Sequence, residues 1–540
     1  MTIQKHLLAI CGASLFQGQM VSAYELHEWG TFTTVSGSDG GLLAGVEVEE
    51  EHLPPFVYSH IGMRGLSSPY SPFYYTSFSP GSLPFQNKQQ ISVALQQAGI
   101  EKVLHQDLGS LKGIERALLE NVTVKMETPV IYIYGDDAPK VNIKVGFNGG
   151  TISQWYPQRK SGDTPNLVPK DQYTISPQLQ QVLGGRDMVF LRQPINFGDQ
   201  TKPYQGAIEW DVEVLPKSDA DPALTFKTDE NPTWIYPRVP SANVLKVGEE
   251  HEDFLFYRGV GNFALPATFG VDATETVIVK NRSKQAIPFA FAFENIGGVF
   301  RYKTIGAVAP GATAQVAETE WIKPQSAATQ KIEVFQQMRQ GLMAQGLNAD
   351  EANGMVKTWW KSYFDKTGLR VFWIVPQSDL EQVLPLQASP TPAKKVRVLV
   401  GRADIMRPQL EQQMIADLGT KAYHKYTADR FFPSYTNRLK QLVKEPVFQK
   451  FDEENLADSY QIITAKKGET EKRENIYLAG NHEIQLQHLK LSGKWQIIGN
   501  DQLKIGDTVF HLDAKTGMLT AKATDDPNYE TYQIQLSKAL

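Results

Sequence analysis

Residues 208–214 read IEWDVEV, and this stretch decides the fold class because apolar and acidic side chains alternate strictly along it. A period of two predicts a strand with one face buried and the other facing water. The same alternation occurs in residues 122–126 and in 141–147, which end at the turn Asn148-Gly149-Gly150. Further short strands are expected at 275–280 and 289–294. Strands and turns at this spacing predict one large or two smaller antiparallel β-sandwiches over residues 119–324.

Residues 325–455 change character and predict an α+β module. The first expected helix carries an apolar face, and Asn348 and Glu351 form a capping box that begins a second helix. Trp359 lies on the apolar face of that second helix, so we expect the hairpin 332–364 to be part of the core. Two nearly continuous apolar runs, 369–375 and 396–401, predict strands that are covered on both faces. The face of the first helix is assigned to Ile332, Phe335, Met338 and Leu342.

The two ends of the chain differ from this middle. Residues 24–118 form an irregular N-terminal region that includes an acidic run, Glu47-Val48-Glu49-Glu50-Glu51, and a stretch rich in proline and aromatic residues, 67–85. Residues 456–540 return to short strands and form a C-terminal β region. The predicted fold class is therefore mainly β with an α+β module: antiparallel β-sandwich(es), a helical hairpin plus strands, and a C-terminal β region.

The first 23 residues have the layout of a secretory signal peptide. Lys5 and His6 form a short basic start, residues 7–16 are apolar, and Val21-Ser22-Ala23 offers small residues at the cleavage positions. We expect cleavage after Ala23 and a periplasmic or extracellular protein. The apolar run is shorter than the ~20 residues that a transmembrane helix needs, so no transmembrane anchor is expected.

Composition narrows the chemistry of the mature, multidomain chain. The full sequence has one cysteine, Cys11, and it lies in the predicted signal peptide, so the mature chain has no disulfide, thiolate metal site or cysteine nucleophile. The formal net charge is −5 and the basic residues form no tail or stripe. Nucleic acid is therefore not an expected partner.

Histidines and carboxylates near the N-terminus are candidate metal ligands. His27, Glu28, His52 and His60 lie close together in sequence, around the acidic run and the pair Pro54-Pro55. Imidazole and carboxylate groups are ligands for divalent zinc, copper, iron or manganese. The spacing matches no established metal motif, and the alternative is a solvated acidic loop with ordinary hydrogen-bonding histidines. A divalent metal is accordingly a possible cofactor, and the cofactor is otherwise unknown.

Three further groups of residues carry a functional and a structural interpretation each. Glu209, Asp211 and Glu213 share one strand face, which suits glycoside hydrolysis or calcium binding but also a solvated sheet surface. The aromatic stretches 67–85, 155–157 and 234–237 suit stacking on sugars or plugging of the core. A loop with two arginines after a strand suits an anion site or a structural ion pair. Its charged residues are Arg402, Asp404 and Arg407.

Several motifs resemble an uncharacterised family of secreted bacterial proteins with an N-terminal HEWGTFT signature, found here at His27–Thr33. The resemblance extends over about residues 25–440. It implies secretion and one integrated architecture, and it implies no reaction, ligand or catalytic residue. The other motifs that carry it are LPPFV at 53–57, KMETPV at 125–130, QWYP at 154–157, FLFYRGVGNF at 254–263, MVKTWW at 355–360, GLRVFWIVP at 368–376 and VGRADIMRP at 400–408.

These observations favour a secreted or periplasmic protein that binds or scaffolds an unknown extracellular ligand, a glycan or a peptide. Two alternatives stay open. The first is a metal-dependent enzyme that uses the N-terminal His and Glu residues. The second is a structural protein of the cell envelope.

Overall fold

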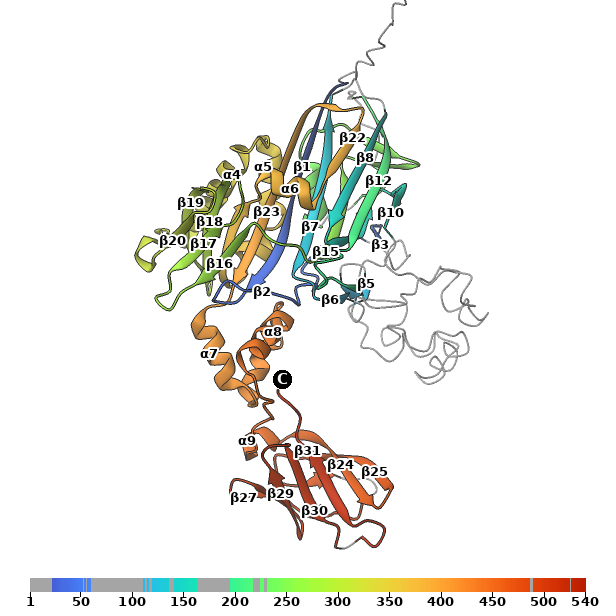
Figure 1. Ribbon diagram of the computed structural model, residues 1–540, viewed down its shortest axis with the longest axis vertical. Coiled ribbons are helices and arrows are strands. Elements are labelled where there is room, and N and C mark those ends of the chain that lie inside the picture. The colour runs from blue at the N-terminus through green and yellow to red at the C-terminus, as the bar shows by residue number, and fades with distance from the viewer. Residues whose placement is uncertain are drawn as a thin grey trace, which may run out of the picture.

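The fold of the chain is taken from a computed structural model (Figure 1). It describes residues 22–51, 53–54, 56–59, 110–111, 114–115, 119–135, 140–163, 195–216, 224–227, 231–485, 489–524 and 526–540. Strands exceed helices, at 44% against 20%, and most of the sheets are antiparallel. The predicted mainly β fold with α+β features is therefore confirmed. The predicted signal peptide lies outside the described residues except for Ser22 and Ala23, with which the first strand begins.

One large sheet forms the upper part of the molecule (Figure 1). At its centre lies β1 (Ser22–Ser36), which pairs antiparallel with β7 (Val124–Tyr134) and parallel with β23 (Pro392–Ile405). The sheet continues on one side through β15 (Leu255–Gly261) and β9 (Gly150–Tyr156). On the other side it continues through β21 (Gly368–Ile374), β18 (Ile287–Ile296) and β19 (Val299–Val308).

The sheet curls over one of its two faces, and the strands beyond β9 enclose an apolar core there. β8 (Lys140–Asn148) and β12 (Gln205–Val214) pair along nine positions, and β22 (Leu386–Ser389) adds to β8. Buried and exposed residues alternate along β12, as its sequence predicts, with Ile208, Trp210 and Val212 in the core. A separate sheet of β16 (Ala267–Val271), β17 (Val277–Asn281) and β20 (Thr313–Val316) contributes to the same core.

Helices cover the second face of the sheet. α4 (Ala327–Met343) and α5 (Ala349–Thr358) form the predicted hairpin, followed by a π-helical turn, Trp360–Phe364. They pack with α3 (Pro232–Ile235) on a second apolar core that includes Trp29, Phe291 and Trp359. The capping box is present as predicted, because the Asn348 side chain accepts from the Glu351 N–H while the Glu351 carboxylate accepts from the Asn348 N–H.

The predicted face of α4 is wrong in part. Ile332 is 63% exposed and Phe335 only partly buried, while Val334 joins Met338 and Leu342 in the core. The cause lies at Gly341, where an added Cβ would lie 2.6 Å from the ring of Phe289. Because a side chain cannot fit there, Gly341 brings its own face of the helix against the sheet.

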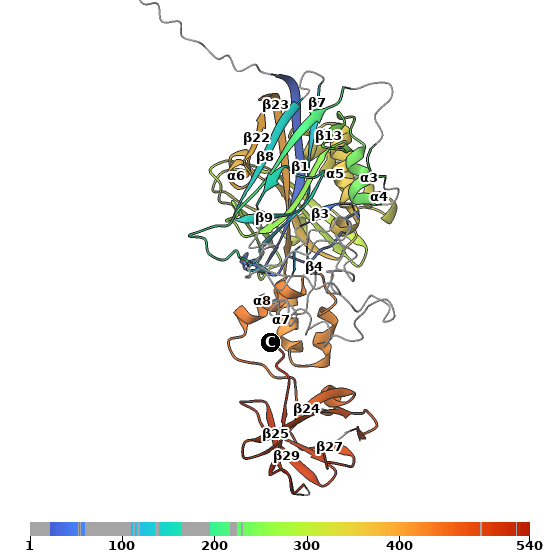
Figure 2. The same cartoon turned by 90° about the vertical axis from the view of Figure 1, so that its right-hand side faces the viewer.

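The chain then runs below the sheet through α7 (Pro408–Asp417), the 3₁₀ segment Lys421–Tyr426 and α8 (Phe432–Leu442). Both views place these helices between the large sheet and a separate C-terminal sheet (Figures 1 and 2). That sheet has its own apolar core and eight strands in the order β26-β25-β24-β31-β30-β29-β28-β27. An additional bridge from Glu483 to Lys494 brings its two ends together. We call it the C-terminal barrel, and its strands are β24 (Ser459–Lys467), β25 (Thr470–Leu478), β26 (Ile484–Gln485), β27 (Trp495–Ile498), β28 (Gln502–Ile505), β29 (Thr508–Asp513), β30 (Met518–Lys522) and β31 (Thr531–Gln535).

Short elements complete the fold. The helical ones are the 3₁₀ segments Tyr236–Arg238 and Glu318–Glu320, α6 (Gln377–Val383) and α9 (Glu453–Leu456). The strands are β2 (Leu42–Leu43), β3 (Tyr58–Ser59), β4 (Ser110–Leu111), β5 (Ile114–Glu115), β6 (Leu119–Glu120), β10 (Ser161–Gly162), β11 (Ile195–Asn196), β13 (Leu245–Val247) and β14 (Glu250–Glu252). In the described part of the chain, no helix is both long enough and apolar enough to cross a membrane.

Candidate binding site at the charged end of the sheet

The helix-covered face of the large sheet changes from apolar to charged along its strands. Side chains two positions apart on a strand share a face. On β23 the core residues Val398 and Val400 are thus followed on one face by Arg402 and Asp404. Two other strands of the sheet also change from an apolar to a charged side chain on this face, from Phe372 to Arg370 on β21 and from Phe256 to Arg258 on β15. On β1 the apolar Trp29 is followed on the same face by the polar residues Thr31 and Thr33.

Ten charged side chains meet at this end and form a network of ion pairs, which we call the charged cluster. Lys125 contacts Glu127 at 3.4 Å, and Arg258 contacts Glu49 at 3.1 Å. Five side chains are positive and five are negative, so their formal charges cancel. Its members are Lys125, Arg258, Arg370, Arg402 and Arg430 with Glu49, Glu50, Glu51, Glu127 and Asp404.

The last three residues of the acidic run, Glu49, Glu50 and Glu51, belong to this cluster, so the interpretation of the run as a solvated loop is wrong for them. Glu50 receives hydrogen bonds from Lys125 Nζ at 2.5 Å, from Arg402 Nη2 at 2.6 Å and from Arg430. Burial opposes the ionisation of this carboxyl, but the charges of Arg402, Lys125 and Arg430 hold the pKa of Glu50 well below its usual value. The run lies inside the protein because its carboxylates neutralise arginines that the sheet buries.

Arg402 and Asp404 confirm the ion-pair interpretation, but their predicted place in a loop is wrong, because β23 continues to Ile405 through its pairing with β1. Arg402 Nε lies 2.8 Å from Asp404 Oδ2, and its guanidinium stacks 4.2 Å from the ring centre of Tyr363. Arg402 is fully buried and its pKa is raised: burial works against the charge, but Glu50 and Asp404 outweigh it. Arg407 lies between β23 and α7, and it pairs instead with Glu294 at 2.7 Å and with Glu275.

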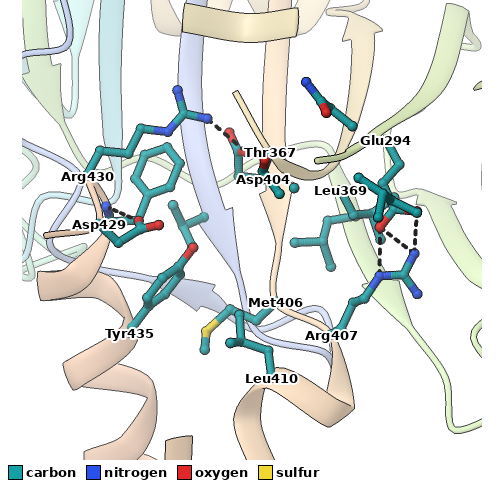
Figure 3. A pocket seen from close by; sticks show the side chains of 16 residues that line it. Glu294, Thr367, Leu369, Asp404, Met406, Arg407, Leu410, Asp429, Arg430 and Tyr435 are labelled. Atoms are coloured by element: carbon teal, nitrogen blue, oxygen red, sulfur yellow. Dashed lines mark hydrogen bonds and ion pairs between the residues drawn. The ribbon is translucent and has the colours of Figure 1, made fainter. Parts of the chain in front are cut away.

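A pocket of about 230 Å³ adjoins the charged cluster between the end of the sheet and helices α7 and α8 (Figure 3). Figure 3 shows the Arg430–Asp404 pair on one wall and the Arg407–Glu294 pair on the other, with Leu369 between them. Further apolar lining comes from Val35, Ile405, Met406, Leu410 and Phe431. The pocket therefore combines an apolar floor with charged walls of both signs.

Asp429 and Tyr435 supply two more polar groups of the pocket, beside Asn295 and Thr367. Asp429 Oδ1 accepts a hydrogen bond from the Phe431 N–H at 2.8 Å, and Oδ2 has no partner among the described residues. Packing around the carboxyl and the negative charges of Asp404 and Glu50 raise the pKa of Asp429. Burial likewise raises the pKa of the Tyr435 phenol. Asp429 is an exposed residue, so its second carboxylate oxygen is open to a donor that enters from solvent.

The predicted metal ligands His27 and Glu28 project from opposite faces of β1, because they are consecutive residues of one strand. Glu28 accepts from Arg397 Nε at 2.6 Å and from the Tyr257 hydroxyl at 2.7 Å. Their side chains therefore do not converge on one point.

His27 has a carboxylate at each ring nitrogen. Nδ1 lies 3.0 Å from Glu351 Oε1, and Nε2 lies 3.3 Å from Glu25 Oε2. The predicted ligands His52 and His60 lie outside the described residues. Within the described ranges, no three His, Cys, Asp or Glu side chains are arranged to hold a metal ion.

The other two sequence-based candidates have structural roles where they are described. Glu209 and Asp211 pair with Lys160 on the open sheet surface, and Glu213 lies 3.7 Å from Lys246. Trp155, Tyr156 and Trp234 are buried, which favours the core interpretation of the aromatic stretches. The stretch 67–85 lies outside the described residues.

Sequence reasoning did not find Asp429, Arg430, Tyr435 or Glu294. These residues come from two segments, β18 and the start of α8 with the residues just before it, and they meet only because the fold brings α8 to the end of the sheet. One usable signal exists, namely the abrupt change from the apolar run 396–401 to Arg402 and Asp404. No protein-family model and no curated protein matches the chain, so the case for this site rests on its geometry.

Proposed function

We propose that this protein binds peptides and that its pocket receives a basic side chain, that of lysine or arginine. The observation that carries the proposal is the charge of the pocket. Its described lining has three carboxylates, Glu294, Asp404 and Asp429, against two guanidiniums, Arg407 and Arg430. Both arginines are already paired with carboxylates, whereas Asp429 Oδ2 has no partner in the described part of the chain. Glu294 also pairs with Arg301, and Asp404 also pairs with Arg370 and Arg402, so the negative charge that remains for a ligand is that of Asp429.

The size and floor of the pocket support the same ligand. Its volume of about 230 Å³ is below the ~300–1,000 Å³ of pockets that enclose a whole drug-sized ligand. A pocket of this size suits one side chain of a larger molecule. The apolar floor of Leu369, Ile405 and Met406 suits the methylene stem of lysine or arginine, whose charged end would reach Asp429.

Titration calorimetry with the peptides Gly-Lys-Gly, Gly-Arg-Gly, Gly-Leu-Gly and Gly-Glu-Gly tests the proposal. We expect binding of the two basic peptides only. A hydrogen bond to a charged group contributes about 1.5–3 kcal/mol, so Asp429→Asn should weaken binding roughly 10- to 100-fold. Asp365→Asn is the matched control, because Asp365 is an exposed aspartate that pairs with Lys331 outside the pocket lining. Equal binding of all four peptides, or none, contradicts the proposal.

The proposal includes secretion, with cleavage after Ala23 and a periplasmic or extracellular location. The layout of residues 1–23 and the resemblance to secreted proteins with the HEWGTFT signature support it. Sequencing of the mature N-terminus from the native host should begin at Tyr24. Full-length protein retained in the cytoplasm would contradict this part of the proposal.

The two alternatives give different results in simple assays. A metal-dependent enzyme that uses His27, Glu28, His52 and His60 should retain stoichiometric metal when purified without chelator and lose it in a His27→Ala/His52→Ala variant. A structural protein of the cell envelope should bind none of the test peptides and should sediment with envelope material. The peptide-binding proposal predicts a lysine- or arginine-dependent heat of binding instead.

A further inference from the structure

The C-terminal barrel carries a pair of aromatic rings on its outer face, one exposed and one half-buried. Tyr460 on β24 lies opposite Tyr477 on β25, and their ring centres are 4.7 Å apart at an angle of 36°. Tyr460 is 74% exposed, and Ile462, two positions along the same face, is 55% exposed. These three side chains form one continuous strip, which we call the tyrosine strip.

The barrel does not need the tyrosine strip for its core. The inward residues of β24 are Gln461, Ile463 and Ala465, and they alternate with the strip residues. Single exposed apolar residues are ordinary, but adjacent ones on neighbouring strands indicate a contact surface. Tyr477 is also oriented, since its hydroxyl donates to Asp458 Oδ1 at 3.1 Å.

The surroundings of the strip select the ligand. The side chains next to Ile462 across the sheet are neutral amides, Asn475 on β25 and, by the register of β24 with β31, Gln535. Charged groups lie at the two ends of the strip, where Asp458 accepts from the Tyr477 hydroxyl and Arg473 follows two positions from Asn475 on the same face. A stable protein interface buries about 800 Å² on each partner, far more than three side chains provide. A sugar ring needs less area, because its C–H face stacks on one aromatic ring while its hydroxyls meet amide donors and acceptors.

We propose that the tyrosine strip binds a neutral glycan, with consecutive sugar rings stacked on Tyr460 and Tyr477. The tilt between the two aromatic rings suits sugar units that turn relative to one another along a chain. This site lies on the C-terminal barrel, away from the pocket at the end of the large sheet, and does not depend on the peptide proposal (Figures 1 and 2).

Affinity electrophoresis of the full chain in gels that contain soluble neutral polysaccharides tests the proposal. The probes are a β-glucan, an α-glucan, a xylan and a mannan, with dextran sulfate as the charged comparison. We expect at least one neutral polysaccharide to retard the wild-type protein, and Tyr460→Ala to weaken this binding at least tenfold. Tyr460→Phe keeps the ring and should retain binding. Ile498→Ala, which removes another exposed apolar residue of the barrel, should leave it unchanged.

Two results overturn the proposal. The first is that none of the neutral polysaccharides retards the wild-type protein. The second is that Tyr460→Ala binds as well as the wild type, in which case the tyrosine pair only stabilises the β24–β25 hairpin. The melting temperature of each variant distinguishes lost binding from lost folding.

Discussion

Arg402 is the residue that links the acidic run to the sheet. It is completely buried and contacts Glu50 at 2.6 Å and Asp404 at 2.8 Å. Removing one partner of a buried ion pair leaves an uncompensated charge and typically costs about 3–5 kcal/mol. We expect Arg402→Met to lower the free energy of unfolding by this amount in urea titrations.

Lys160→Met is the control for Arg402→Met. Lys160 also contacts two carboxylates, those of Glu209 and Asp211, but it is 50% exposed. Exposed ion pairs contribute roughly 0–1 kcal/mol, so this substitution should change stability little. Equal effects of the two substitutions would show that the burial of the charged cluster does not matter to the fold.

Glu50 makes the stability of the protein depend on pH in the acidic range. Its pKa in the folded protein is lowered below the usual 4.5, so the unfolded chain takes up a proton at higher pH than the folded one. The contribution of Glu50 is therefore complete above about pH 4.5 and decreases as the pH falls below it. Urea titrations at pH 7, 4.5 and 3 should show this loss. The loss should be smaller in Glu50→Gln, and an identical pH profile in that variant would contradict the assignment.

Residue-level prediction worked where one strand decides the environment and failed where distant segments meet. The alternation in 208–214 correctly predicts which side chains of β12 are buried. The burial of Glu50 could not be predicted, because acidic runs are usually solvated and its partners Arg402 and Arg430 are more than 350 residues away. Ion pairs with residues far away in the sequence stabilise the buried Glu50 carboxylate, and no local sequence pattern indicates such pairs.

At the scale of elements, the end of α5 supports the second core. Trp359 is 2% exposed, lies edge-on to Trp29 at 5.5 Å and stacks on Tyr363 at 5.8 Å. Replacing a buried tryptophan by alanine costs about 3–5 kcal/mol. We expect Trp359→Ala to lower the melting temperature clearly in circular dichroism, whereas Ile332→Ala on the exposed side of α4 should stay within about 0.5 kcal/mol of the wild type. A large loss of stability in Ile332→Ala would show that Ile332 is buried, as the sequence predicts for this face of α4.

The helical hairpin shows how far element prediction extends. Its position and its capping box follow from local chemistry, and both are present. The face that α4 buries does not follow, because Ile332 and Phe335 offer a second apolar register beside Val334 and Met338. Which of the two apolar faces packs on the sheet depends on the contact of Gly341 with Phe289, and Phe289 belongs to β18 rather than to the helix.

At the scale of the whole molecule, the C-terminal barrel has a core separate from those of the large sheet. Trp495 lies in that core, 1% exposed, and donates to the Ala479 carbonyl at 2.8 Å. We expect calorimetry to resolve two unfolding transitions and Trp495→Ala to lower only one of them. In that variant, binding of Gly-Lys-Gly at the pocket should persist. A single transition that shifts as a whole would show that the barrel and the sheet unfold together.

The regions expected from the sequence are joined more closely than their composition indicates. Strands from the predicted N-terminal, β-sandwich and α+β regions all belong to the one large sheet. The C-terminal β region, in contrast, forms its own sheet. Composition and periodicity identify strands, but they carry no information on which strands pair across long stretches of chain.

The central position of β1 has a consequence for how the protein is made. One edge of this strand pairs with β7, but the other pairs only with β23, and the Glu28–Arg397 contact between them joins residues 369 positions apart. During synthesis β1 emerges first, and that edge stays open until residues 392–405 follow. Contacts so distant slow folding, because a long loop must close before they form. The middle of the sheet therefore stays incomplete until about three quarters of the chain has been made, and the earlier strands wait for a partner that is synthesised much later.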